Sequence, residues 1–131
     1  MNTKLRNLFD AELETVLTEV PQQVRDLLEK VPLVVEDYPS REVMRRTHVR
    51  RRSELCGLYT GIPLIRRSVD DWGVPSDVIH LYREGILSLA TKSDGTISRT
   101  RLRRQIRVTL LHELGHHHGM TERELRELGY G

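Results

Sequence analysis

Apolar residues recur at helical spacing near both ends of the chain. Residues 4–19 predict an amphipathic helix, and residues 98–117 predict a second, longer one. The first helix has its apolar positions at Leu5, Leu8, Phe9, Leu13, Val16 and Leu17. The second has one apolar line, made of Leu102, Ile106, Leu110 and Leu114. Each helix is therefore expected to bury one face in a core and to expose the other.

Shorter segments between these two helices alternate between strand and helix patterns. β-prone runs at 31–36, 55–60 and 77–83 predict three strands. Helical segments are expected from Pro21 to about Glu29, over 41–47 and around 86–90, with basic or polar loops at 48–53 and 92–98. Helices that surround a few strands define an α+β fold, here a short mixed sheet packed against helices.

Length and composition limit the classes of function. At 131 residues, the chain is expected to form a single domain over residues 1–131. No apolar run approaches ~20 residues, so no segment is expected to span a membrane. Residues 1–16 lack the apolar centre of a signal peptide, which favours a cytoplasmic location. The one cysteine, Cys56, can form no internal disulfide and is expected to be a small apolar filler.

The cations of the chain are clustered and are nearly all arginines. Six arginines lie between residues 41 and 52, and five lie between residues 99 and 107. Such clusters can meet phosphate groups or an acidic protein. However, nineteen acidic residues hold the formal net charge to +2, and only one Trp, one Phe and four Tyr can stack against bases. The pattern therefore disfavours nucleic-acid binding and favours solvated helix faces. It specifies no oligomeric state.

The string HELGHHHGM at residues 112–120 contains the pattern H-E-x-x-H near the end of the second long helix. His112 and His116 lie only about 40° apart around a helix axis and one turn apart along it. Two imidazoles placed in this way can together bind one Zn²⁺, each through one ring nitrogen. Glu113 is rotated away from that line and can take a proton from water that the metal acidifies. The pattern predicts a zinc site with two histidine ligands and Glu113 as the catalytic base.

A catalytic zinc usually has three protein ligands, so a third donor is expected nearby. Gly119 and Glu122 extend the motif to H-E-x-x-H-x-x-G-x-x-E. Gly119 would end the helix in a left-handed turn, and the reversed chain would carry Glu122 towards the metal as third ligand. Residues 121–124, T-E-R-E, also fit a capping box that opens a last helix. In that alternative, Glu122 only interacts favourably with the helix dipole.

The C-terminal segment VTLLHELGHHHGMTERELRELGYG contains this motif, and three further segments belong with it: VPLVVEDYPS, LCGLYTGIPLIRRS and DVIHLYREGIL. Together they resemble the small single-domain zincin-like metallopeptidases of bacteria over nearly the whole chain. The resemblance implies a minimal zincin core, a Zn²⁺ cofactor and hydrolysis of peptide bonds in a peptide or protein substrate. It also implies an acidic ligand at Glu122, where the family commonly has Asp and this chain has the longer Glu.

Other residues near the motif have less specific roles. His117 and His118 point away from the two motif histidines and are expected to pack or to face solvent. In zincins the substrate lies along an edge strand near the motif helix, and the segment 77–83 is the strand chosen here. His80 on that segment is a rival metal ligand, although an ordinary strand position is favoured. Tyr130 has two possible roles, stabilising an oxyanion or packing a terminal helix, and packing is favoured.

Two functions of different class remain open. The first is a zinc metallopeptidase that uses Glu113 as its base. The alternative is a metal-bound regulatory or interaction module, with little or no proteolytic activity, that binds a protein or nucleic acid through its arginine-rich face. Glu113 favours the peptidase, because a structural zinc needs no base and tends to have four protein ligands. The small size of the chain favours the alternative.

Overall fold

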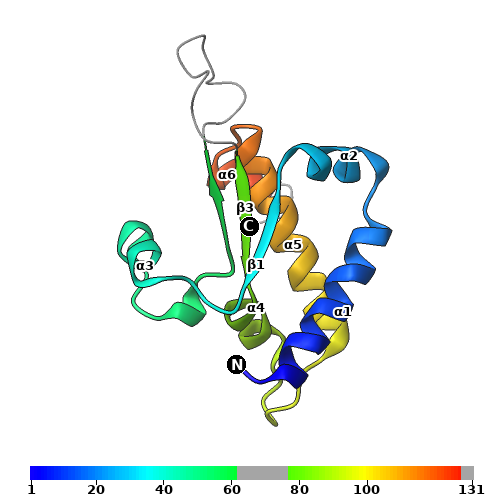
Figure 1. Ribbon diagram of the computed structural model, residues 1–131, viewed down its shortest axis with the longest axis vertical. Coiled ribbons are helices and arrows are strands. Elements are labelled where there is room, and N and C mark those ends of the chain that lie inside the picture. The colour runs from blue at the N-terminus through cyan, green and yellow to red at the C-terminus, as the bar shows by residue number, and fades with distance from the viewer. Residues whose placement is uncertain (62–76, 128–131) are drawn as a thin grey trace.

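The computed structural model describes residues 1–61 and 77–127, in which six helices surround a small sheet (Figure 1). The helices are α1 (Thr3–Glu19), α2 (Gln22–Lys30), α3 (Arg41–Thr47), α4 (Arg83–Ala90), α5 (Arg99–His117) and α6 (Glu122–Glu127). The strands are β1 (Leu33–Glu36), β2 (Gly57–Thr60) and β3 (Val78–Tyr82), and a short 3-10 helix, η1 (Arg52–Glu54), precedes β2. The predicted α+β fold is confirmed.

The sheet is mixed, and β3 lies in its centre. β1 pairs with β3 in parallel and β2 pairs with it in antiparallel orientation, which gives the order β1-β3-β2. The choice of segment 77–83 as the edge strand for a substrate is therefore wrong, because other strands take both edges of β3. Among the described strands, β1 and β2 are the edges, and β2 is the one that packs along α5.

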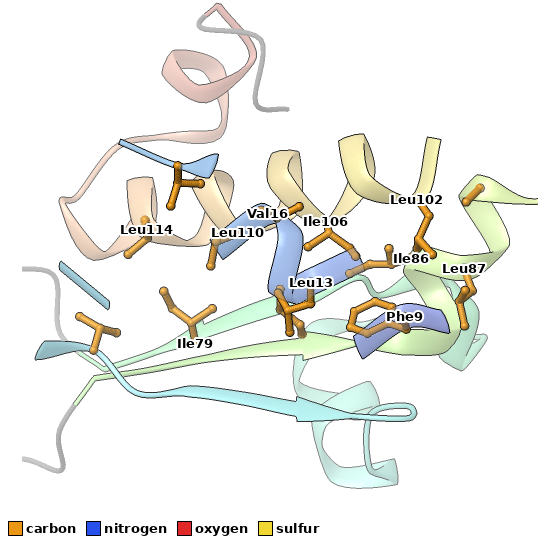
Figure 2. Close-up of a cluster of buried hydrophobic side chains, with 14 residues drawn as sticks. Phe9, Leu13, Val16, Ile79, Ile86, Leu87, Leu102, Ile106, Leu110 and Leu114 are labelled. Atoms are coloured by element: carbon orange, nitrogen blue, oxygen red, sulfur yellow. The ribbon is translucent and has the colours of Figure 1, made fainter. Parts of the chain in front are cut away.

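The core lies between the sheet and the helices α1, α4 and α5. Figure 2 shows the apolar side chains of α5 pointing towards Ile79 of the sheet and Val16 of α1. Each buried aliphatic side chain stabilises the fold by about 1.5–3 kcal/mol. Burial of this one line fixes the rotation of α5 and leaves His112 and His116 only partly covered. The fully buried side chains include Phe9, Val16, Ile79, Leu81, Ile86, Leu102, Ile106 and Leu110.

Three arginines of α5 hold α1 through ion pairs. Arg99 and Arg103 donate to the two carboxylate oxygens of Glu12 at 2.9 and 2.8 Å, and Arg107 pairs with Glu19 at 3.0 Å. The Glu12 side chain is only 4% exposed. Burial by itself would raise the pKa of Glu12, but the hydrogen bonds from Arg103 and Arg99 outweigh burial and lower it. Three of the five arginines between residues 99 and 107 thus form ion pairs within the fold.

α4 begins directly where β3 ends, earlier than the helical segment around 86–90 that the sequence predicts. Its first residue is Arg83 rather than a residue near 86. The Arg83 guanidinium pairs with Asp10 of α1 and with Asp37 after β1, at 3.0 Å each. The Glu84 amide also donates to the Asp37 carbonyl oxygen at 2.9 Å. These contacts between distant segments fix the first turn of α4, and local patterns do not reveal them.

Two expectations from the sequence lie outside the described residues, namely the role of Tyr130 and the part of the LCGLYTGIPLIRRS block that follows Gly61. Within residues 1–61 and 77–127, no helix combines the length and the apolar character needed to cross a membrane.

Candidate metal centre

Two histidines of α5 form the middle of the site. His112 and His116 lie one turn apart, and their Nε2 atoms are 3.1 Å from each other. The ring planes meet at 80°, and the ring centroids are 4.7 Å apart. The two side chains are 17% and 25% exposed, so they are accessible from solvent. The structure therefore brings the two predicted histidine ligands together at an accessible position.

The chain reverses directly after these histidines through a glycine turn. Gly119 has a φ of 79°, which costs a residue with a Cβ roughly 1–2 kcal/mol. Its amide donates to the His116 carbonyl oxygen at 2.9 Å, and the Met120 amide donates to the Gly115 carbonyl oxygen at 3.0 Å. These two bonds form a Schellman motif. The left-handed turn predicted at Gly119 is confirmed.

Glu122 is carried back to the histidines by this turn. Its Oε1 lies 2.9 Å from His116 Nε2, and its Oε2 lies 3.3 Å from His112 Nε2. The Glu122 side chain is 64% exposed. Its place beside the histidines is consequently set by the turn and by these polar contacts, not by packing.

The capping box of the alternative interpretation is also present. The Glu124 amide donates to Thr121 Oγ1 at 3.2 Å, and the Thr121 amide donates to Glu124 Oε1 at 3.4 Å. The acid that closes the box is therefore Glu124. Glu122, the first residue of α6, takes no part in these two bonds and directs its carboxylate to the histidines. The two interpretations of T-E-R-E are compatible.

The donor groups of His112, His116 and Glu122 have a spacing close to the one that a zinc ion requires. Two bonds of about 2.0–2.1 Å that meet at a tetrahedral angle separate their ligand atoms by about 3.4 Å. In this site, His116 Nε2 lies 3.1 Å from His112 Nε2 and 2.9 Å from Glu122 Oε1, and His112 Nε2 lies 3.3 Å from the other carboxylate oxygen, Glu122 Oε2. Imidazole and carboxylate are both common zinc ligands. His112, Glu113 and His116 in addition form a group whose potential ligand atoms lie within 4.8 Å of one another. The residues present fit a zinc ion.

Glu113 lies beside this group in a buried position. Its side chain is 9% exposed, and its Oε2 is 3.9 Å from His112 Nε2. Burial raises the pKa of Glu113, although the two histidines and a hydrogen bond from the Tyr59 backbone amide act in the opposite direction. A buried carboxyl group beside potential metal ligands is placed to exchange a proton with a molecule bound in the site.

A hollow of about 400 Å³ lies over the donor atoms, with α5 on one side and β2 on the other. A second hollow of about 240 Å³ shares Gly57, His112 and Glu113 with the first. A Cβ at Gly57 would lie 2.8 Å from Thr109 Cγ2 and 3.2 Å from Glu113 Cγ. Glycine at this position therefore allows β2 to approach α5 closely. The larger hollow is lined by Leu55, Gly57, Leu58, Tyr59, His112, Glu113, His116 and Glu122.

A buried acid-histidine pair supports the end of α5. His117 Nδ1 lies 2.8 Å from Asp77 Oδ2, and both side chains are at most 6% exposed. The His117 ring also meets the Tyr59 ring edge to face, with centroids 5.8 Å apart. His117 packs and His118 is exposed, as the helical geometry predicts. No local pattern in the sequence points to Asp77, Tyr59 or Gly57, because their contacts join segments that are far apart in the chain.

His80, the rival metal ligand, is placed elsewhere. Its Nδ1 lies 3.5 Å from Glu36 Oε1, and its ring stacks on that of Tyr82 with centroids 6.2 Å apart. Ile79 and Leu81 point into the core, so His80 points to the opposite face of the sheet.

Comparison with known families agrees with this geometry. A family model described as zincin-like metallopeptidase matches residues 28–131. Because this span is most of the chain, the protein belongs to the family of zincin-like metallopeptidases. Membership implies a divalent metal, typically zinc, and a peptide or protein as substrate. A comparison with curated proteins finds no match.

Proposed function

We propose that this chain is a zinc-dependent peptidase in which His112, His116 and Glu122 hold the metal and Glu113 is the general base. One observation carries the proposal. The Nε2 atoms of His112 and His116 lie 3.1 Å apart, and each lies 2.9 to 3.3 Å from one carboxylate oxygen of Glu122, at a hollow that also contains the buried carboxyl group of Glu113. Structural zinc sites tend to have four protein ligands, whereas three ligands leave a position for water. The donor set therefore supports a catalytic site.

The residues of the chain divide the chemistry between them. Held by these side chains, zinc supplies a Lewis acid that acidifies water and polarises a peptide carbonyl. Glu113 accepts one proton from the attacking water, whose oxygen forms a bond to the carbonyl carbon. The same carboxyl group then donates that proton to the leaving amine as the C–N bond breaks. The Tyr59 amide, which hydrogen-bonds to Glu113, holds the carboxyl group in position.

The outer edge of β2 is the proposed binding edge for the substrate. β2 stands at one end of the strand order within residues 1–61 and 77–127. Leu58 and Tyr59 of this strand line the same hollow as the two metal-binding histidines. An extended peptide can add to such an edge through main-chain hydrogen bonds. A peptide paired with β2 would place its backbone next to Glu113.

Zinc binding tests the ligand set. We expect one zinc per chain, with loss of zinc in His112→Ala and in His116→Ala. Glu122→Gln should weaken zinc binding because it removes the ligand charge, while Glu122→Asp should retain more affinity. Glu124→Gln is the matched control, since Glu124 lies on the same helix but its carboxylate bonds Thr121. Zinc content and a zinc titration check these expectations. Equal affinity in Glu122→Gln and Glu124→Gln would contradict the third ligand.

Cleavage of an unstructured polypeptide tests the role of Glu113. Glu113→Gln is nearly isosteric, so the fold and the zinc content should remain while the rate falls by about 10²–10⁴-fold. A chelator should abolish wild-type activity, and added zinc should restore it. If wild type and Glu113→Gln are equally inert towards a broad peptide library, and both capture the same partner, the chain is an interaction module instead. Equal activity in both proteins would indicate a contaminating protease.

A further inference from the structure

A group of arginines surrounds α3 and the segment that follows it. We call the set Arg41, Arg45, Arg50, Arg51 and Arg52 the arginine surface; all five residues are exposed. Figure 1 shows α3 on the side of the sheet opposite α1. A hollow of about 500 Å³ is lined by four of these arginines, and a neighbouring one of about 380 Å³ is lined by Arg41 and Arg45. The two hollows share Arg41 and Met44.

The arginine surface differs from the arginine cluster of α5 in its partners. On α5, Arg99, Arg103 and Arg107 are paired with acids of α1. On the arginine surface, within the described part of the chain, only the Arg52 guanidinium has a carboxylate partner, Glu84 at 3.0 Å, while Arg50 donates to Glu54 through its backbone amide alone. Four guanidinium groups in one region thus remain available for a negatively charged partner.

The surface between these arginines is partly apolar. Met44 lines both hollows, and Val49 lines the smaller one. Methionine and arginine are enriched in protein interfaces, where the thioether adapts its shape and the guanidinium binds carboxylates in a fixed plane. A partner that matches both features has carboxylates next to aliphatic side chains. We propose that the arginine surface binds an acidic polypeptide segment that contains aliphatic residues.

Nucleic acid fits this surface less well. The one aromatic ring that lines the larger hollow is that of Tyr38, and the Arg52 guanidinium lies over it, 4.0 Å from the ring centroid. One face of this ring is therefore already covered by a cation and is not open for stacking with a base. Phosphate backbones also make no use of the apolar surface at Met44 and Val49. The positive charge of the arginines and the apolar surface at Met44 and Val49 together favour a polypeptide as the partner.

The place of η1 in the chain indicates that this polypeptide segment belongs to the substrate. Glu54, the last residue of η1, lines the hollow of about 240 Å³ that His112 and Glu113 also line. Arg52 and Ser53, directly before it, line the hollow of about 500 Å³ on the arginine surface. A peptide on β2 advances about 3.3 Å per residue, so a chain that continues past the start of β2 reaches the arginine surface within a few residues. This part of the inference rests on the proposed peptidase function.

Binding is tested first in the Glu113→Gln background, where no cleavage interferes. The probe is a labelled short peptide of Glu, Asp and Leu, compared with a neutral peptide of Gln, Asn and Leu. Arg41→Glu/Arg51→Glu should raise the Kd of the acidic peptide about tenfold or more, because attraction is replaced by repulsion at two positions. The matched control is Arg101→Glu/Arg104→Glu on α5, which makes the same charge change on exposed arginines that line neither hollow.

Three binding results would overturn the inference. One is equal affinity for the acidic and neutral peptides. Another is an equal loss of affinity in the control, which would make the effect one of net charge. The third is tighter binding of a single-stranded oligonucleotide than of the acidic peptide at the same salt concentration. An unchanged Kd in the control together with the loss in Arg41→Glu/Arg51→Glu supports it.

Cleavage kinetics then separate docking from catalysis. The same cleavable peptide is compared with and without an acidic extension. In the otherwise wild-type protein, the extension should lower KM, and Arg41→Glu/Arg51→Glu should remove this gain without changing cleavage of the unextended peptide. An extension that leaves KM unchanged overturns the assignment to the substrate while the peptidase function stands. If neither peptide is cleaved, the peptidase proposal and the substrate assignment fall, and the binding experiment alone decides whether the surface holds acidic polypeptides.

Discussion

Gly57→Ala tests whether the close approach of β2 to α5 sets the geometry of the site. The added methyl group would lie 2.8 Å from Thr109 Cγ2, 3.0 Å from the His80 carbonyl oxygen and 3.2 Å from Glu113 Cγ. Carbon atoms in van der Waals contact are about 3.5–4.0 Å apart. The methyl group therefore meets α5 and β3 at once, and β2 has to move away from α5.

The expected cost follows from the crowding. Overpacking a well-packed site typically costs about 1–3 kcal/mol, and a loss of about 2 kcal/mol lowers the Tm of a chain of this size by roughly 6–12 °C. α5 is held by its buried apolar line, so the displacement falls on β2. Because the Tyr59 amide hydrogen-bonds to Glu113, we expect the peptidase rate to fall as well.

A double-mutant cycle with Thr109→Ser identifies the cause. This second change removes Cγ2, the atom in closest contact, and keeps the hydroxyl that accepts from Gln105 Nε2 at 3.2 Å. By itself it should cost about 0.5–1.5 kcal/mol, like other losses of one buried methyl group. Urea unfolding of the four proteins gives the free energies. The double variant should be more stable than the sum of the single effects predicts, by about 1 kcal/mol. Additivity within about 0.3–0.5 kcal/mol would refute the reasoning.

Two further predictions concern other parts of the structure. Gly119→Ala should lower the free energy of unfolding by about 1–2 kcal/mol, because Gly119 has a φ of 79°. It should also weaken zinc binding more than Gly119→Asn does, because Asn tolerates this φ. Equal zinc affinity of the two variants in calorimetric titrations would contradict this role of the turn. The pKa of Glu12 is lowered in the fold. At a pH above the ordinary Glu pKa of about 4.3, the Glu12 carboxylate should therefore make the wild type more stable than Glu12→Gln. This difference in stability should disappear as the pH falls through the lower pKa of the folded state. Urea unfolding at several pH values checks this prediction, and parallel stability curves for the two proteins would speak against it.

The composition of the candidate site follows from the sequence, because its spacing is a property of the local backbone. Any α-helix places His112 and His116 on one side one turn apart, whatever surrounds it. The glycine at 119 determines the reversal in the same local way, since its φ of 79° is adopted most readily by a residue without a Cβ. The buried line on α5 was likewise predictable, because helical periodicity and burial are directly linked.

The tertiary structure alone decided which strand borders the site. The alternation of residues 77–83 is the same for an edge strand and for a central one, so it could not show that β2 rather than β3 lies on the outside. Spacing in the sequence also could not predict the close approach of Gly57 to Thr109 or the buried pair of Asp77 and His117. Strand order, close backbone approach and ion pairs between distant residues depend on how all elements pack together. Local backbone geometry constrains none of them.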